Sequence, residues 1–250
     1  MKIRYFIISC LLLLCLLCHS SCRKASTSRT RHERQIEHVQ SKEETKTVRP
    51  SKKHTIINKK SSKKLDGREV FDKYSTAVFM VFTSDGMNGY QGSGFFIDNE
   101  GLAVSNYHVF KGTEIGLEKI KLLGSDVAHN VTEIIAKDEE EDYILFRVDC
   151  DNTNYLPLAS SRPQIGEKVF AIGSPRGLEN TFSSGEISQW REKNLMQINV
   201  LIDHGSSGGA LINEYGEAVG ITSGTFYDGS QANLNYAWSI EVIKPHLKFK

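Results

Sequence analysis

The chain has 250 residues, of which 39% are hydrophobic and 24% charged, which suits one globular domain with extra segments or two small lobes. The formal net charge of +1 hides an uneven distribution: residues 23–68 hold 15 Lys/Arg against five Asp/Glu, whereas residues 69–250 hold 14 against 25. Four of the five cysteines lie in the first 22 residues, so the body has only Cys150 and cannot form an internal disulfide. The body must therefore fold without covalent cross-links, which a length of roughly 180 residues permits.

The first 22 residues have the pattern of an export signal. Lys2 and Arg4 precede an apolar run at residues 5–18, which is too short for a membrane span and has the length of a signal core. Residues 19–22 (HSSC) resemble a bacterial lipoprotein cleavage site, in which Cys22 is lipidated and becomes the mature N-terminus. An ordinary cleaved signal and an uncleaved anchor are the alternatives. We therefore expect a signal peptide at 1–22 and an exported protein, periplasmic or membrane-anchored as a bacterial lipoprotein.

Residues 23–66 are predicted to be a basic, disordered linker. The segment is rich in Lys, Arg, Ser and Thr, and its few large apolar residues cannot bury enough surface to offset the entropy of ordering. A second interpretation is a tail that rests on anionic lipid or polymer, because runs of cations favour such surfaces. Nucleic acid is not an expected partner, since no module that reads it follows.

The body, from about Gly67 to residue 250, has the pattern of an all-β fold. A helical turn is expected at 69–74. Short apolar runs separated by Gly, Asn and Asp then follow at 77–82, 94–98, 102–110, 143–148, 168–173, 196–202, 209–213 and 217–224. This spacing predicts a barrel or a sandwich, and the lack of βαβ alternation argues against a Rossmann-type sheet. A short C-terminal helix is expected at about 239–248, where Pro245 limits its length.

Ser207 is the candidate nucleophile, within the G-x-S-G-G motif at 205–209. A serine hydroxyl attacks efficiently only when a base takes its proton, and the attack creates an oxyanion that needs positioned N–H donors. A tight loop at 205–207 can aim the N–H groups of Gly205 and Ser207 at one point, because glycine adopts backbone angles that other residues avoid. A flexible glycine-rich turn is the alternative interpretation.

His108 and Asp142 are the candidate partners of this serine. The strand-like run at 102–107 leads into His108, which places the imidazole at a strand end near the core. Asp142 ends the acidic run at 138–142 and directly precedes an apolar strand, which would draw it inward to accept a hydrogen bond from the imidazole. Asp138 is the substitute candidate. The order His, Asp, Ser is that of the chymotrypsin class, not of subtilisin or the α/β-hydrolases.

Around these residues the sequence resembles the HtrA/Deg family of trypsin-like serine proteases. The resemblance covers about residues 67–248 and includes two departures, Tyr143 and Ile144 in place of smaller residues and Ser206 where asparagine is common. It is carried by QGSGFFIDNEGLAVSNYHVFKG at 91–112, EDYILFRV at 141–148, EKVFAIGSPRGLENTFSSGEIS at 167–188, INVLIDHGSSGGALINEYGEAVGITSG at 198–224 and NYAWSIEVIKPHL at 235–247.

The resemblance implies a chymotrypsin-like double β-barrel. Two six-stranded Greek-key barrels, at about 67–155 and 156–250, would enclose the catalytic cleft. It further implies an oxyanion hole of the Gly205 and Ser207 amides, action on unfolded or partly folded exported proteins, and cleavage after small or aliphatic residues, because Leu201 occupies the pocket position. The other implied pocket residues are Thr222, Ser223 and Gly224.

Further expectations concern cofactors, assembly and rival functions. No metal or organic cofactor is expected, because the sequence has neither a Cys/His cluster with ligand spacing nor a G-x-G-x-x-G after a strand. No PDZ domain is expected, and a trimer, common in the family, has no support in these residues. One rival is a peptide-binding module on a protease fold with little turnover. The other is a surface-bound scaffold whose basic tail is the working part.

Overall fold

A computed structural model of the chain describes residues 55–56, 63–114, 116–225 and 234–249. The predicted signal peptide at 1–22, with Cys22, lies outside the described residues. Of the predicted linker at 23–66, the structure describes two pieces. In one of them β1 (Thr55–Ile56) pairs in parallel with β14 (Lys248–Phe249). The other piece, residues 63–66, leads into α1 (Gly67–Tyr74). Within the described ranges, no helix is long and apolar enough to cross a membrane.

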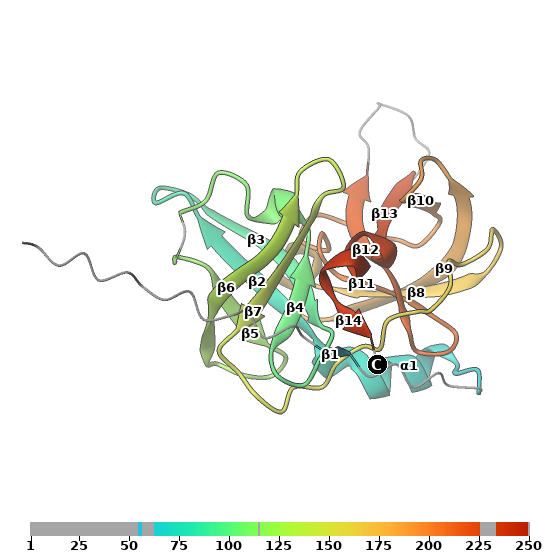
Figure 1. The fold of residues 1–250 in the computed structure, drawn as a ribbon, viewed down its shortest axis with the longest axis horizontal. Helices are drawn as coiled ribbons and strands as arrows, with labels where there is room; N and C mark the ends of the chain where they lie inside the picture. The colour runs from blue at the N-terminus through green and yellow to red at the C-terminus, as the bar shows by residue number, and fades with distance from the viewer. Residues whose placement is uncertain (1–54, 57–62, 115, 226–233, 250) are drawn as a thin grey trace, which may run out of the picture. The chain divides into compact units, whose positions relative to one another are not determined.

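Twelve strands form two closed barrels of six strands each, joined throughout by antiparallel pairs. The first barrel closes in the order β2-β3-β4-β7-β6-β5 and the second in the order β10-β13-β12-β11-β8-β9. Figure 1 shows the two barrels beside each other, with α1 below them. The first contains β2 (Val78–Ser84), β3 (Gly89–Phe96), β4 (Leu102–Ser105), β5 (Lys119–Leu122), β6 (Ala128–Asp138) and β7 (Tyr143–Val148). The second contains β8 (Lys168–Gly173), β9 (Thr181–Trp190), β10 (Leu195–Ile198), β11 (Ala210–Asn213), β12 (Ala218–Thr225) and β13 (Asn235–Ser239).

The predicted fold class, an all-β chymotrypsin-like double barrel, is confirmed. Helical structure outside the barrels is short. At the start of α1, the Asp66 carboxylate accepts from the Glu69 N–H at 2.8 Å and the Glu69 carboxylate accepts from the Asp66 N–H at 2.9 Å, a capping box that fixes where the helix begins. The predicted C-terminal helix takes the form of two 3-10 turns, η4 (Ile240–Val242) and η5 (Lys244–His246), and Pro245 lies in the second.

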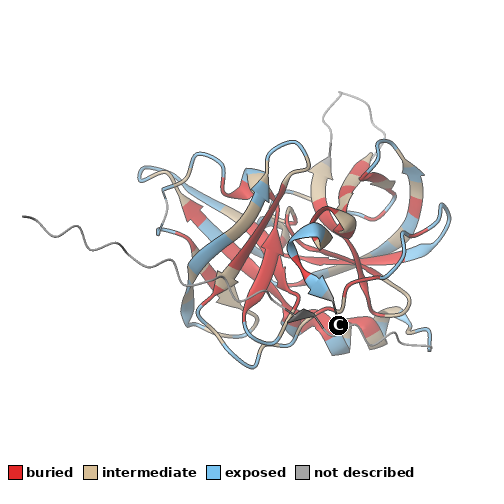
Figure 2. Cartoon of the chain, in the orientation of Figure 1, coloured by how far each residue is buried: buried red, intermediate tan, exposed pale blue. Residues whose placement is uncertain are grey.

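Three apolar clusters hold the fold together. One fills the first barrel and another fills the second. The third contains side chains of both barrels, such as Phe95 and Leu145 from the first and Phe170 and Ile172 from the second. Figure 2 shows buried residues along the strands of both barrels, whereas many of the turns between strands are exposed. Because apolar surface that both barrels share is removed from water, the barrels pack as one body and hold the loops between them in fixed positions.

Candidate active site

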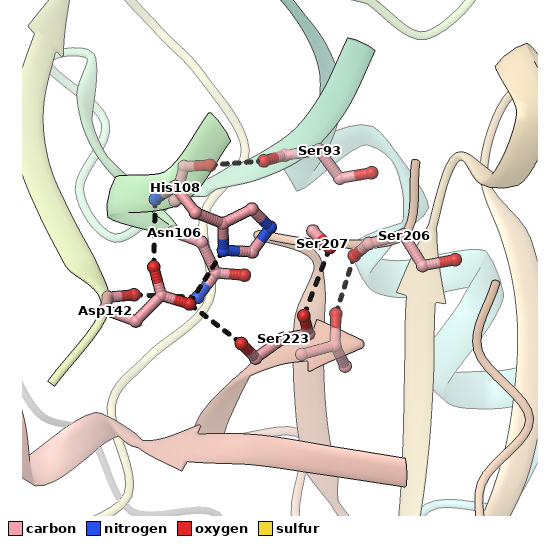
Figure 3. A network of polar contacts seen from close by, with 9 residues as sticks. Ser93, Asn106, His108, Asp142, Ser206, Ser207 and Ser223 are labelled. Atoms are coloured by element: carbon pink, nitrogen blue, oxygen red, sulfur yellow. Dashed lines mark hydrogen bonds and ion pairs between the residues drawn. The ribbon is translucent and has the colours of Figure 1, made fainter. Parts of the chain in front are cut away.

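His108 and Asp142 meet through two hydrogen bonds. His108 lies in the 3-10 turn η2 (Tyr107–Val109), directly after β4, and Asp142 lies in the turn between β6 and β7. Imidazole Nδ1 is 2.8 Å from Asp142 Oδ2, and the His108 backbone N–H donates to Asp142 Oδ1 at 2.9 Å. A carboxylate accepts hydrogen bonds, so Nδ1 carries the proton and Nε2 keeps a free lone pair. Figure 3 shows Nε2 pointing toward Ser207.

Two further side chains hold Asp142 in place. The Ser223 hydroxyl donates to Asp142 Oδ2 at 2.8 Å, and the Asn106 amide donates to the Asp142 carbonyl at 2.8 Å. Asp142 has φ +43, a left-handed backbone that aspartate tolerates better than most residues. These contacts fix a carboxylate in a strained turn, so it faces the histidine before any substrate binds. The sequence predicts Ser223 as a residue of the substrate pocket and assigns no role to Asn106.

Asp138, the substitute candidate, has different partners. Its Oδ1 accepts from the N–H groups of Glu140 and Glu141, both at 2.8 Å, and so closes the turn that leads to Asp142. The structure therefore brings Asp142 to His108 and uses Asp138 to shape the turn.

Ser207 lies on the loop between β10 and β11. Its hydroxyl donates to the Ser223 carbonyl at 3.3 Å, and its own carbonyl accepts from the Ser93 N–H of β3 at 2.8 Å. Among the described residues, the Ser207 hydroxyl has no hydrogen bond to His108. A hydroxyl rotates about its Cα–Cβ bond at little cost, and such contacts often tighten only once substrate is bound.

The backbone N–H groups of Gly205 and Ser207 donate to no acceptor in the described part of the chain. At Ser207 the N–H is left without an acceptor because the carbonyl of the same peptide, Ser206 O, is held on the opposite side. Ser206 O accepts from the Gly209 N–H at 2.9 Å and from the Thr222 hydroxyl at 2.7 Å. In a trans peptide the N–H points opposite to the carbonyl, so these bonds turn the Ser207 N–H outward.

The peptide between His204 and Gly205 is anchored in the same way. His204 O accepts from the Arg176 N–H at 2.8 Å, which directs the Gly205 N–H to the opposite side. Gly205 has φ +93, and a Cβ added there would lie 2.4 Å from Gln91 Oε1. Its carbonyl accepts from the Ser93 hydroxyl at 2.7 Å. Glycine is required here because both the backbone angle and the close approach exclude a side chain.

A family model described as the trypsin-like peptidase domain matches residues 92–221, a range that contains His108, Asp142 and Ser207. The chain belongs to this family. Within it, the chain is of the HtrA/Deg type.

Individual relatives agree with this assignment. The probable periplasmic serine endoprotease DegP-like of Halomonas elongata is 34% identical over 160 residues, which are 60% of this chain and 33% of that protein. The mitochondrial serine protease HTRA2 of Drosophila virilis is 31% identical over 185 residues, 69% of this chain and 42% of that protein. The chain thus spans between a third and about two fifths of the length of these relatives.

Solved structures show the same fold. The serine endoprotease from Yersinia pestis superposes with a TM-score of 0.65 at 25% identity, covering 72% of this chain and 64% of that one. The HtrA-type protease AlgW with tripeptide superposes with a TM-score of 0.63 at 23% identity, covering 72% and 62%, and shows the fold alone.

The predicted pocket residues of this peptidase domain occupy different environments. Leu201 is 66% exposed on the segment that leads to Ser207. Gly224 has φ +118, and a Cβ there would lie 3.8 Å from Ser207 Oγ, so this glycine borders the nucleophile. Thr222 is 1% exposed, and its hydroxyl binds Ser206 O. The structure therefore places Thr222 behind the nucleophile loop, where its hydroxyl orients the peptide that precedes Ser207.

Charged side chains lie beside the nucleophile loop. Among the described residues of the peptidase domain, no group of three or more His, Cys, Asp or Glu side chains is arranged to hold a metal ion. The pKa of the Asp203 carboxyl is held below its ordinary value, first by the His204 N–H and then by the Arg176 guanidinium. Asp203 therefore stays ionised wherever a histidine can act as a base.

Proposed function

We propose that this domain is a serine endopeptidase that works through an acyl-enzyme. Ser207 Oγ attacks the carbonyl carbon of the scissile bond while His108 Nε2 takes its proton. His108 then gives that proton to the leaving amine, and the acyl group stays on Ser207. A water molecule, activated by the same nitrogen, releases the second product. The observation that carries the proposal is the two-point contact of Asp142 with His108, which leaves Nε2 as an acceptor facing Ser207.

Two groups of contacts supply the electrostatic part of the reaction. Asp142 stabilises the imidazolium that forms when His108 takes the proton. In a related triad, replacement of the aspartate by asparagine lowers kcat by about 10⁴-fold. The free N–H groups of Gly205 and Ser207 are proposed to bind the oxyanion, where each donor contributes about 10²- to 10³-fold. Both N–H groups are directed by hydrogen bonds on the far side of their peptides, so no reorganisation is needed during attack.

The proposed substrates are unfolded or partly folded exported proteins. The relatives are serine proteases by name, and the resemblance to the HtrA/Deg family supports this substrate class. Leu201, Ser223 and Gly224 are proposed to border the pocket for the side chain that precedes the cut. Because the side chain at 201 is apolar, we expect cleavage after small or aliphatic residues and not after Lys or Arg.

We also propose that the protein is exported and is anchored through lipid on Cys22. The support is the sequence of residues 1–22, together with the periplasmic relative. Mass spectrometry of the mature N-terminus tests the anchor. The proposal requires a diacylated Cys22 in the wild type and an unlipidated, uncleaved precursor in Cys22→Ser.

A peptide-binding module with little turnover is the second candidate. One observation favours it: the Ser207 hydroxyl donates to the Ser223 carbonyl and not to His108. In that function the cleft would hold an extended peptide while the nucleophile stays unactivated.

One experiment separates the two functions. The wild type and Ser207→Ala are incubated with reduced casein, fragments are mapped by mass spectrometry, and both proteins are exposed to a serine-directed phosphonate. The peptidase predicts cleavage and labelling of the wild type, with Ser207→Ala slower by several orders of magnitude. Equal binding of casein by both proteins, with neither cleavage nor labelling, would contradict it and support the binding module.

A further inference from the structure

We infer that the ion pair between Arg176 and Asp203 positions the oxyanion-binding amide of Gly205. The inference rests on the proposed peptidase function and adds two positioning residues to it. Neither side chain is assigned a part in the proton transfers. Both act on the orientation of one peptide group.

Asp203 accepts three hydrogen bonds that join the segments around Gly205. Arg176 Nε donates to its Oδ2 at 2.7 Å, and the His204 N–H donates to its Oδ1 at 2.7 Å. The Ser206 N–H donates to its carbonyl oxygen at 2.9 Å. The Arg176 backbone N–H completes the arrangement by donating to His204 O at 2.8 Å. The peptide on each side of Gly205 is thus held by a group of this cluster.

The turn that carries Arg176 is strained. Within η3 (Pro175–Gly177), Arg176 has φ +52 and ψ 29, a left-handed conformation that is unfavourable for a residue with a Cβ. The strain persists only if contacts hold the turn, and two side-chain contacts add to the bond between the Arg176 N–H and His204 O. One is the guanidinium on Asp203, and the other is the Gly177 N–H, which donates to Gln91 Oε1 at 3.2 Å.

The consequence follows from peptide geometry. If the turn relaxes, Arg176 N–H leaves His204 O, and the 204–205 peptide loses the contact that fixes its plane. A rotation of this peptide would carry the Gly205 N–H away from the oxyanion and bring a carbonyl toward it. Loss of the Gly205 donor weakens binding of the oxyanion, which forms only in the transition state. Relaxation of the turn should therefore lower kcat and leave KM almost unchanged.

The ion pair is exposed, which limits its effect. The side chains of Arg176 and Asp203 are 74% and 41% exposed, and exposed pairs shift an equilibrium by about fivefold at most. Loss of either charge is therefore expected to lower kcat by about three- to fivefold, well short of the loss of the Gly205 donor itself.

The test compares Arg176→Ala, Arg176→Gly, Asp203→Asn and the double variant Arg176→Ala/Asp203→Asn in the full-length protein. The measurements are kcat and KM on a peptide substrate, the rate of phosphonate labelling, and the melting temperature. Lys121→Ala is the matched control: it breaks the Lys121–Glu179 pair, which involves the same connection after β8 but makes no contact with the nucleophile loop.

We expect Arg176→Ala and Asp203→Asn each to lower kcat by about three- to fivefold with KM within about twofold, and the double variant to lose no more than either single change. Arg176→Gly should be more active than Arg176→Ala, because glycine adopts the left-handed turn without strain. Lys121→Ala should behave as the wild type. Unchanged kcat in both single variants, additive losses, or a change confined to KM would overturn the inference. A wild type as inactive as Ser207→Ala would instead overturn the proposed function.

Discussion

Replacement of Gly205 by alanine is the most direct perturbation of the proposed oxyanion site. The added Cβ would lie 2.4 Å from Gln91 Oε1, 2.8 Å from the Ser174 carbonyl oxygen and 3.1 Å from the Arg176 nitrogen. The first neighbour is the end of a flexible side chain and can move. The other two are backbone atoms, so the loop itself must shift. Alanine is also strained at φ +93.

The expected result is a large loss of turnover with a moderate loss of stability. Displacement of the Gly205 N–H removes one oxyanion donor, and we expect kcat to fall by about 10²- to 10³-fold while KM changes little. The backbone strain is worth about 1–3 kcal/mol, which in a domain of this size lowers the melting temperature by about 5 °C. Steady-state kinetics on a peptide substrate and thermal unfolding measure the two effects separately.

Gly166→Ala is the matched control. Gly166 has φ +83, yet a Cβ added there would meet no atom within 4 Å. The substitution therefore imposes similar backbone strain without a collision. We expect a comparable small drop in melting temperature and wild-type kinetics. Full activity of Gly205→Ala, or equal losses of activity in both variants, would refute the assignment of the Gly205 amide to the oxyanion.

Three further predictions concern the triad, the free thiol and the core. Ser223→Ala removes one donor from Asp142 Oδ2 but leaves both contacts between Asp142 and His108. We therefore expect kcat on a peptide substrate to fall by about tenfold. An unchanged kcat would show that the Ser223 hydroxyl is dispensable. Burial, together with acidic neighbours, raises the pKa of the Cys150 thiol from 9.0 to about 11. Alkylation of this thiol by iodoacetamide at pH 8, followed by mass spectrometry, should therefore be about a hundredfold slower in the folded than in the unfolded chain. The rate in the folded chain should rise as the pH approaches 11. Equal rates would contradict the burial. Phe79→Ala removes a side chain that is 1% exposed at the centre of the first barrel, and denaturant unfolding should show a loss of about 3–5 kcal/mol, whereas a loss below about 1 kcal/mol would mean that the site collapses around the missing ring.

The strands that the sequence predicted are the buried ones. The run at 143–148 became β7, of which five of six residues are buried, and the run at 168–173 became β8 with the same proportion. By contrast, β6 and β9 are long strands whose residues are mostly exposed or intermediate, and β5 is short, so their apolar signal was too weak to stand out. A hydrophobic pattern reports burial, and a barrel strand whose residues are mostly exposed shows little of that pattern.

Local sequence and chain order determined the all-β class, the identity of His108 and Ser207 as candidates, and the need for glycine at 205. Each of these depends on residues that lie close together in the chain, whereas the double barrel was implied by the family resemblance. Only the tertiary structure decided that Asp142 faces His108 while Asp138 closes a turn, and that Thr222 lies behind the nucleophile loop. The contacts of Ser223 with Asp142 and of Arg176 with Asp203 join segments 81 and 27 residues apart. Such pairs exist because the packing of the two barrels fixes the loops between them, and that packing is a property of the whole fold and not of any segment.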